Sequence, residues 1–300
     1  MPQQFSKTTK IGCIGLGSMG APIARRLQEN GFGLTLYARR PDVFDHELAD
    51  LITGGARIAS TPADMAADVD IILVNVMAGD DSRQVLLDGV DAVAKSGRQG
   101  GLVILDHSTI DPQDAITIHK DLHAHGHVYI DAPVSGGSIG ATAGTLVTMM
   151  GGDDNMIAAL DPVLDTYTAS RRVMGGPGMG QVAKLCNQIA QVITIQGIGE
   201  SMAFAEALGA DKQKVFDVMS SGFAASRMLE LLGPKMVADD MTPLMKSRLL
   251  EKDIGIALSS SQDAGLDLPA LSLVRNAVKT LQDLGKHDDD IASLYHLVKK

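Results

Sequence analysis

The sequence predicts an α/β protein in which a doubly wound domain, residues 1–175, is followed by an all-helical domain, residues 176–300, and a long helix joins the two. Three observations lead to this prediction. Short β-branched apolar runs alternate with amphipathic stretches up to about residue 175, a glycine-rich loop follows the first of these runs, and only helical patterns occur after residue 180. Strands that alternate with helices are typical of βαβ units and a mostly parallel sheet.

The predicted strands of the first domain are residues 11–14, 34–37, 71–76, 102–105 and 127–130. Most of them precede helix-like sequence. The clearest helix starts after Asp111, a favourable N-cap, with Pro112 at its first position, and Gly126 is the glycine expected just beyond its end. Cofactor-binding loops are expected at the carboxyl ends of such parallel strands.

The second domain begins with a proline-free helical pattern at about residues 181–208. Further helices are predicted at about residues 211–221, 224–233, 242–263 and 268–284, followed by a short terminal helix. At about 1.5 Å per residue, the first helix is longer than a small domain is wide. Long apolar helices of this kind often pack against a second subunit, so we expect a homodimer or a homotetramer.

Composition narrows the class of protein. The net charge of −10 and the lack of any Lys/Arg block predict that nucleic acid is not a partner. Two cysteines, Cys13 and Cys186, stand in apolar sequence without metal-ligand spacing, so we expect reduced core thiols and no metal. No apolar run approaches 18 residues and the first ten residues are polar, which predicts a cytoplasmic protein without a membrane segment.

A glycine-rich loop lies between the first predicted strand and the helix after it. Gly15, Gly17 and Gly20 fit the pattern G-x-G-x-x-G, in which the first glycine makes a tight turn, the second admits a pyrophosphate and the third allows close packing. This pattern is typical of a Rossmann dinucleotide-binding domain; the alternative is a structural turn. The predicted cofactor-binding loop comprises Gly15, Leu16, Gly17, Ser18, Met19 and Gly20.

The end of the second predicted strand carries Ala38, Arg39 and Arg40. An NAD site normally places an acidic residue here to bind the ribose hydroxyls, and Ala38 does not provide one. Arg39 and Arg40 are instead suited to a 2′-phosphate, so the sequence favours NADP over NAD. A solvated arginine pair in a turn, partly neutralised by Asp42, is the alternative.

A candidate proton donor lies one turn into the long helix. Hydride transfer to a carbonyl needs a group that protonates the developing alkoxide, and Lys184 has the chemistry for it. Its position near the positive end of the helix is expected to lower its pKa. Asn187 and Gln188 follow at i+3 and i+4, and either amide is placed to bind the same substrate oxygen. The alternative for Lys184 is a solvated helix charge.

Three further segments carry candidate residues. Val76, Met77 and Thr109 follow predicted strands on the cofactor side. The segment after residue 130 contains Ser135, Gly136 and Gly137. The Ser135 hydroxyl and the two glycine amides suit a carboxylate, and the alternative is a structural turn. Lys252 precedes Asp253 on a predicted helix, and because i and i+1 positions do not face each other, we expect Lys252 to point away from Asp253.

Together these segments resemble the β-hydroxyacid dehydrogenase family, whose members include 3-hydroxyisobutyrate dehydrogenase and tartronate semialdehyde reductase. The resemblance covers nearly the whole chain, through IGCIGLGSMGAPIARRL, DHSTIDP, DAPVSGGSIGATAGTL, GPGMGQVAKLCNQ, EKDIGIAL and GKHDDDIASL. It implies reversible oxidation of a short 3-hydroxyacid, with Lys184 as the catalytic residue and an amide from Asn187 or Gln188. It further implies that the segment 135–137 holds the substrate carboxylate, and that Val76, Met77, Thr109 and Lys252 lie near the cofactor.

The sequence departs from the family pattern at three positions. Gln188 stands where many members have Asn, Met77 replaces a common proline, and Arg227 stands where an apolar residue is expected. Arg227 favours a second anionic group on the substrate. Decarboxylating dehydrogenation, imine reduction and a non-catalytic nucleotide-binding module for sensing or assembly are the alternative functions. The short second domain argues against the first, and Lys184 argues against the other two.

Overall fold

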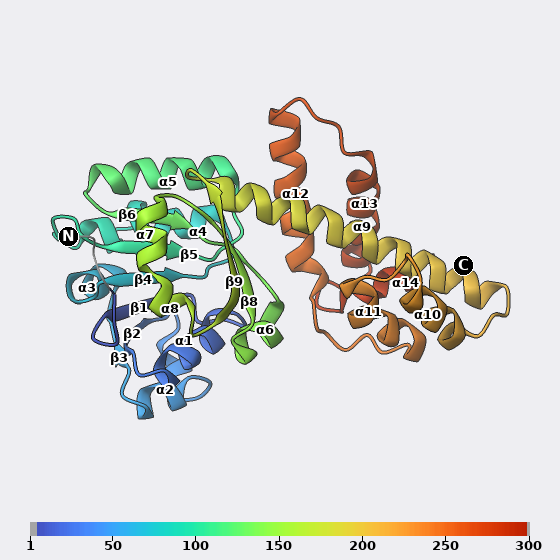
Figure 1. Ribbon diagram of the computed structural model, residues 1–300, viewed down its shortest axis with the longest axis horizontal. Helices are drawn as coiled ribbons and strands as arrows, with labels where there is room; N and C mark the ends of the chain where they lie inside the picture. Colours follow the sequence, from blue (N-terminus) through green and yellow to red (C-terminus); the bar gives the residue numbers. More distant parts are fainter. Residues whose placement is uncertain (1–4, 299–300) are drawn as a thin grey trace. The chain divides into compact units, whose positions relative to one another are not determined.

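The computed structural model describes residues 5–298, and the chain divides into two compact units, Met1–Lys184 and Leu185–Lys300. The predicted fold class is confirmed. A mostly parallel sheet flanked by helices makes up the first unit, and helices make up the second (Figure 1). The division by compactness falls inside the helix α9 (Met179–Ala207), which is a single continuous element.

The sheet of the first unit has the strand order β3-β2-β1-β4-β5-β6-β8-β7, with β9 paired to β8. Strands β1 to β6 pair in parallel, and β8 runs antiparallel to β6 and β7. The strand order reverses beside β1, where such sheets bind ligands at the carboxyl edge. The bounds are β1 Lys10–Ile14, β2 Gly33–Tyr37, β3 Arg57–Ile58, β4 Ile71–Val74, β5 Val103–Asp106, β6 Val128–Asp131, β7 Val134–Ser135, β8 Leu146–Gly151 and β9 Thr168–Gly175.

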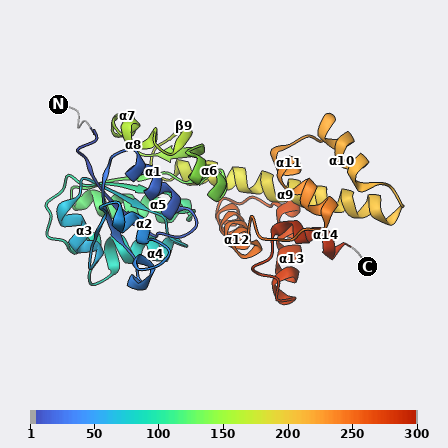
Figure 2. The same cartoon turned by 90° about the horizontal axis from the view of Figure 1, so that it is seen from below.

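Helices cover both faces of this sheet (Figure 2). On one face lie α1 (Gly20–Glu29), α7 (Asp154–Ala159) and α8 (Asp161–Leu164), and on the other α3 (Pro62–Asp68) and α5 (Pro112–Ala124). Shorter helices are α2 (Ala49–Thr53), α4 (Gly79–Arg83) and α6 (Gly137–Ala143). Both faces of the parallel strands are therefore buried, as their continuous apolar sequence requires.

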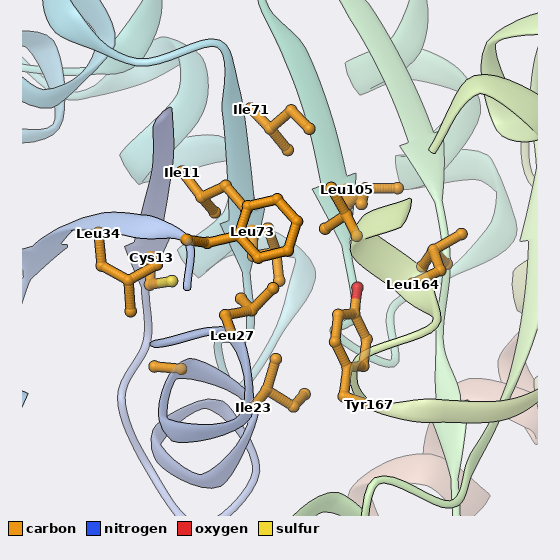
Figure 3. Packing of buried hydrophobic residues seen from close by; sticks show 14 of the residues in the cluster. Ile11, Cys13, Ile23, Leu27, Leu34, Ile71, Leu73, Leu105, Leu164 and Tyr167 are labelled. Atoms are coloured by element: carbon orange, nitrogen blue, oxygen red, sulfur yellow. The ribbon is translucent and has the colours of Figure 1, made fainter. Parts of the chain in front are cut away.

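Side chains of β1 alternate between two cores. Ile11 and Cys13 pack with Ile23 and Leu27 of α1 on one face (Figure 3), whereas Ile14 belongs to the core beneath α3 and α5. This alternation fixes the register of the strand, because a shift by one residue would exchange the two faces. It also fixes where β1 ends, and therefore where the glycine loop begins.

The helix after β5 starts and ends at the predicted signals. Asp111 is the N-cap of α5, and its Oδ1 accepts a hydrogen bond from the Gln113 amide at 2.8 Å. Beyond the last turn, Gly126 adopts a φ of 74°. In contrast, the predicted strand over residues 71–76 stops at Val74, because the Val76 amide donates instead to the Ser108 hydroxyl, at 2.9 Å.

The second unit contains α10 (Lys212–Ser221), α11 (Arg227–Ala238), α12 (Ser247–Asp263), α13 (Pro269–Asp283) and α14 (Leu294–Leu297) around the later part of α9. Two predicted bounds were wrong. Residues 224–226 precede α11, whose N-cap is Ser226, and the helix runs on through Pro234. Residues 242–246 are not helical, because the amides of Leu244 and Met245 donate to the buried Asp290 carboxylate, at 2.6 and 2.8 Å.

The two cysteines have different environments. Cys13 is buried, and burial raises the pKa of its thiol to about 12, as expected for a reduced core thiol. The same expectation was wrong for Cys186, which is exposed on α9.

Apolar side chains on the second unit are exposed, including Phe204, Leu208 and Val218. That a second copy of the chain packs against these helices stays a prediction. No helix in the described part of the chain is long and apolar enough to span a membrane.

A neutral histidine lies in the core behind the carboxyl edge of the sheet. His107 is 3% exposed, with Nδ1 2.6 Å from the Ala132 carbonyl oxygen and Nε2 3.1 Å from the Tyr167 hydroxyl. These partners suit a neutral ring that donates from Nδ1 and accepts at Nε2. Burial lowers the pKa of His107 from 6.5 to about 4. The imidazole therefore contributes to stability only while it stays uncharged.

We expect His107 to make the protein less stable in mild acid. The unfolded chain takes up this proton near pH 6.5 and the folded chain only near pH 4, so stability is lost as the pH falls between these values. Going from pH 7 to pH 5, the stability advantage of the wild type over His107→Gln should shrink by about 2 kcal/mol, measured by urea unfolding. The matched control is His123→Gln, at an exposed position, whose difference from the wild type should not change. A constant advantage over His107→Gln would contradict the assignment.

Candidate active site

The glycine loop follows β1 and leads into α1, as the motif predicts. Gly15 has a φ of 87°, and a Cβ there would stand 2.1 Å from the Asn75 carbonyl oxygen. At Gly20 a Cβ would stand 2.0 Å from the Gly15 carbonyl oxygen. Neither position admits a side chain, so both glycines are needed for the fold of the loop.

Gly17 differs from its two neighbours in the motif. A Cβ at Gly17 would meet no atom within 4 Å, so the space in front of its backbone is open. Beneath the loop, the Asn75 side-chain nitrogen is buried without a hydrogen-bond partner in the described part of the chain. An open backbone at the N-terminus of α1, where amides point outward, fits a dinucleotide pyrophosphate.

The arginines at the end of β2 are exposed. Arg39 and Arg40 follow Ala38, and the Arg39 side chain is 81% exposed with Nη1 3.8 Å from Asp81 Oδ1. An ion pair this long and this exposed leaves the guanidinium hydrated. Arg39 thus pairs with Asp81 in α4 rather than with the Asp42 considered from the sequence. Two exposed guanidinium groups and no carboxylate at position 38 fit a phosphate better than a ribose hydroxyl.

The loops after β4 and β5 are tied together at the carboxyl edge. The Ser108 hydroxyl accepts the Val76 amide, and the Ser108 amide donates to Asp106 Oδ1 at 2.9 Å. Met77 is 46% exposed at this edge, and Thr109 is half-buried. Hydrogen bonds to buried groups therefore hold the predicted cofactor-side residues in place.

The start of α9 is fastened to the end of β6 by a buried carboxylate. Asp131 is 0% exposed; its Oδ1 accepts the Gly178 amide at 2.8 Å and its Oδ2 accepts the Gln181 amide at 2.9 Å. Burial raises the pKa of Asp131 to about 7, against the opposing effect of these two hydrogen bonds. The approach is so close that a Cβ on Gly180 would lie 2.8 Å from Asp131 Oδ2. The position of α9 is therefore set by β6.

The predicted carboxylate-binding segment lies at the same edge, four residues beyond Asp131. Ser135 ends β7 and is half-buried, and Gly136 and Gly137 follow with φ values of 130° and 61°. Both values lie in the region that favours glycine, so this turn cannot be built with ordinary residues. A Cβ at Gly137 would meet no atom within 4 Å, which leaves its backbone open to a ligand.

Lys184 lies in the first turns of α9 and is 7% exposed. It belongs to the same compact unit as the glycine loop, Thr109 and Ser135. The local alternative, a solvated helix charge, does not agree with this burial. The sequence pattern gave no sign of this burial.

A chain of polar contacts lies within the second unit. Asn187 Nδ2 donates to Gln188 Oε1 at 3.3 Å, and Gln188 Nε2 donates to Asp253 Oδ2 at 2.6 Å. Lys252 Nζ lies 3.1 Å from Asp253 Oδ1. The expectation that Lys252 points away from Asp253 was wrong, because its flexible stem folds back over one residue. Arg227, unexpected in the family pattern, has Nη1 2.6 Å from Glu230 Oε2.

Three residues that make these hydrogen bonds were not singled out from the sequence: Asp131 and Gln181 in the first unit, and Asp253 in the second. Asp131 is part of DAPVSGG, and a carboxylate at the end of a buried strand is a usable signal of a functional edge. Gln181 is a polar residue at the start of an apolar helix, which is a weaker signal. Asp253 was noted only beside Lys252, and its contact with Gln188 spans 65 residues of sequence.

Comparison with known proteins identifies the class. Residues 10–176 match the family described as the NAD binding domain of 6-phosphogluconate dehydrogenase, and residues 178–298 match the family described as NAD-binding of NADP-dependent 3-hydroxyisobutyrate dehydrogenase. With the glycine loop in place between β1 and α1, these matches define a nicotinamide-dinucleotide-binding oxidoreductase.

The chain belongs to the β-hydroxyacid dehydrogenase family, whose enzymes act on CH–OH groups. It is 35% identical over 280 residues to the probable 3-hydroxyisobutyrate dehydrogenase-like 1 of Arabidopsis thaliana, covering 93% of this chain and 82% of that protein. It is 33% identical over 285 residues to the 2-hydroxy-3-oxopropionate reductase of Escherichia coli, covering 95% of each. A solved 3-hydroxyisobutyrate dehydrogenase of Mycobacterium tuberculosis superposes with a TM-score of 0.87 at 27% identity, covering 98% of this chain and 100% of that one.

The two kinds of glycine in the loop should respond differently to substitution. Gly17→Ala adds a methyl group where nothing lies within 4 Å, so the melting temperature should stay unchanged while the dissociation constant for the dinucleotide rises about tenfold, equivalent to about 1.4 kcal/mol. Gly20→Ala pushes a methyl group onto a carbonyl oxygen and should lower the melting temperature. Calorimetry and fluorescence titration with NADPH measure both quantities. Unchanged dinucleotide affinity in Gly17→Ala would refute the cofactor role of this loop.

Proposed function

We propose that this protein transfers hydride reversibly between NADP and a short 3-hydroxyacid or its semialdehyde, with Lys184 as the general acid and base. The observation that carries the proposal is the burial of Lys184 in the unit that also holds the glycine loop and the segment 135–137. When bound, NADP supplies the hydride chemistry. The residues of the chain supply carboxylate binding, proton transfer and orientation.

The substrate carboxylate is assigned to the turn after β7. The Ser135 hydroxyl and the amides of Gly136 and Gly137 are donors, and donors that converge at a turn form an anion-binding nest. The open backbone at Gly137 supports this assignment. Because the whole chain carries a net charge of −10, attraction of an anionic substrate must come from local groups such as these.

Lys184 is assigned to the substrate oxygen. During reduction of the carbonyl its Nζ gives a proton to the developing alkoxide, and in the reverse direction it takes the proton from the hydroxyl. Burial disfavours a charged amine relative to a neutral one, which suits a lysine that must exchange a proton in each turnover. The 7% exposure of the side chain supports this role.

NADP is favoured over NAD because of the end of β2. Arg39 and Arg40 are exposed and Ala38 offers no acceptor for a ribose hydroxyl. Guanidinium groups bind phosphate through charge-assisted hydrogen bonds, often two at a time. We therefore assign Arg39 and Arg40 to the 2′-phosphate, and the loop of residues 15–20 to the pyrophosphate.

Replacing Lys184 should abolish most of the turnover without preventing cofactor binding. A general acid–base group contributes about 100-fold to 10,000-fold, and both Lys184→Ala and Lys184→Arg should lose at least about 100-fold in kcat. The arginine variant keeps the positive charge but cannot release a proton, so it separates electrostatics from proton transfer. Rates are measured with 3-hydroxyisobutyrate, 3-hydroxypropionate and glycerate, and NADPH binding by fluorescence. Turnover that survives in Lys184→Ala would exclude the mechanism, and binding of NADPH without activity on any of the three would favour a nucleotide-binding module.

The cofactor assignment predicts a selective loss. Arg39→Ala and Arg40→Ala should each raise the KM for NADPH by about tenfold, because a charge-assisted hydrogen bond is worth about 1.5–3 kcal/mol, while the KM for NADH stays the same. Arg57→Ala, at another exposed arginine in β3, is the matched control and should change neither value. Equal kcat/KM for NADH and NADPH in the wild type would refute the preference.

A further inference from the structure

We propose that Gln181 is a positioning residue that sets the distance between Lys184 and the loop carrying Thr109. The inference rests on the proposed role of Lys184, and it concerns contacts that lie wholly within the first unit. Gln181 is 0% exposed and lies three residues before Lys184, so its side chain points into the protein beside the reacting group.

The side-chain amide of Gln181 makes two hydrogen bonds to the loop after β5. Its Nε2 donates to the Ser108 carbonyl oxygen at 2.8 Å, and its Oε1 accepts the Ile110 amide at 3.1 Å. Thr109 is the residue between these two points. A glutamine amide carries one donor group and one acceptor, so it pairs with the backbone as another peptide group would. Both the distance and the orientation of the Thr109 peptide are therefore tied to α9.

The main chain of Gln181 is held at the same time. Its amide donates to Asp131 Oδ2 at 2.9 Å, and the Gly178 amide donates to the other oxygen of the same carboxylate. Gln181 thus joins three parts of the first unit: the end of β6, the loop after β5 and the start of α9. The predicted carboxylate-binding turn begins at Ser135, four residues beyond Asp131 in sequence.

This arrangement is more than a stabilising contact. Hydride and proton transfer require the reacting atoms to be placed to within a fraction of an ångström, and a misplacement of about 1 Å costs about 100-fold in rate. Lys184 and Thr109 come from different elements, and hydrogen bonds of the Gln181 side chain connect those two elements directly. Its loss should leave the glycine loop and the arginines of β2 intact, and cofactor affinity with them.

The test is Gln181→Met, which keeps the length and helix propensity of the side chain and removes both hydrogen bonds. Gln191→Met makes the same chemical change at a half-buried position further along α9 and is the matched control. Rates are measured with the hydroxyacid that gives the highest wild-type rate and are expressed per NADPH-binding site, so unfolded protein does not count. We expect kcat to fall between about 10-fold and 100-fold in Gln181→Met, with the NADPH dissociation constant within about twofold of wild type.

Two further measurements separate positioning from mere stability. The deuterium isotope effect on kcat, measured with the hydroxyacid deuterated at the carbon that is oxidised, should increase in Gln181→Met, because misplaced reacting groups make the hydride step slower than product release. Gln181→Asn, whose amide is too short to span both contacts, should show the same change; it also serves as the folded variant if the methionine variant does not fold. Wild-type turnover per site in both variants, or in whichever of them folds, would overturn the inference.

Lys184→Ala, measured alongside, separates the two proposals. If Lys184→Ala loses its turnover and the Gln181 variants keep theirs, the general acid–base assignment stands and the positioning role falls. If Lys184→Ala keeps its turnover, the proposed function itself is wrong. A fall in Gln191→Met equal to that in Gln181→Met would also overturn the positioning role, because the effect would then belong to α9 as a whole.

Discussion

One buried carboxylate fixes the geometry of the first unit. Asp131 ends β6, and both of its oxygens accept amides from the first residues around the start of α9. Removing a carboxylate from water is costly, and here two backbone hydrogen bonds compensate for part of that cost. Glycines make the contact possible, since a Cβ on Gly151 or Gly180 would overlap the Asp131 carboxylate or the backbone around it. The location of Lys184 follows from this anchor.

The same carboxylate alters the electrostatics that the sequence suggests. A lysine near the start of a helix is expected to feel the positive end of the helix dipole. Asp131 lies at that end, so an ionised Asp131 offsets the dipole and a protonated one does not. Burial raises the pKa of Asp131 to about 7, so its protonation responds to pH in a range where an exposed carboxyl stays ionised. The electric field along the first turn of α9 therefore depends on the protonation of Asp131. Sequence alone only places this residue at the end of a strand.

The features predicted from sequence are those with local causes. The parallel strands, the glycine loop and the caps of α5 follow from alternation, spacing and capping, all of which act within a few residues. Two of the errors have tertiary causes. The start of α12 depends on Asp290, more than 40 residues away in sequence, and the hydrogen bond of Val76 depends on Ser108. The contact between Lys252 and Asp253 depends on the reach of a flexible stem, which helix geometry does not describe.

The departure at Gln188 illustrates how a longer side chain redirects an amide. Gln188 Nε2 donates to Asp253 Oδ2 at 2.6 Å, and its Oε1 accepts from Asn187. An asparagine is one methylene shorter and, from the same backbone position, would reach less far toward Asp253. Both ends of the Gln188 amide group therefore make hydrogen bonds within the second unit. The side-chain carbonyl oxygen of Asn187 takes no part in this chain of contacts. The two amides that the sequence left equivalent therefore differ in their contacts: Gln188 Nε2 donates a short hydrogen bond to the buried Asp253 carboxylate, whereas Asn187 Nδ2 donates a longer one to Gln188.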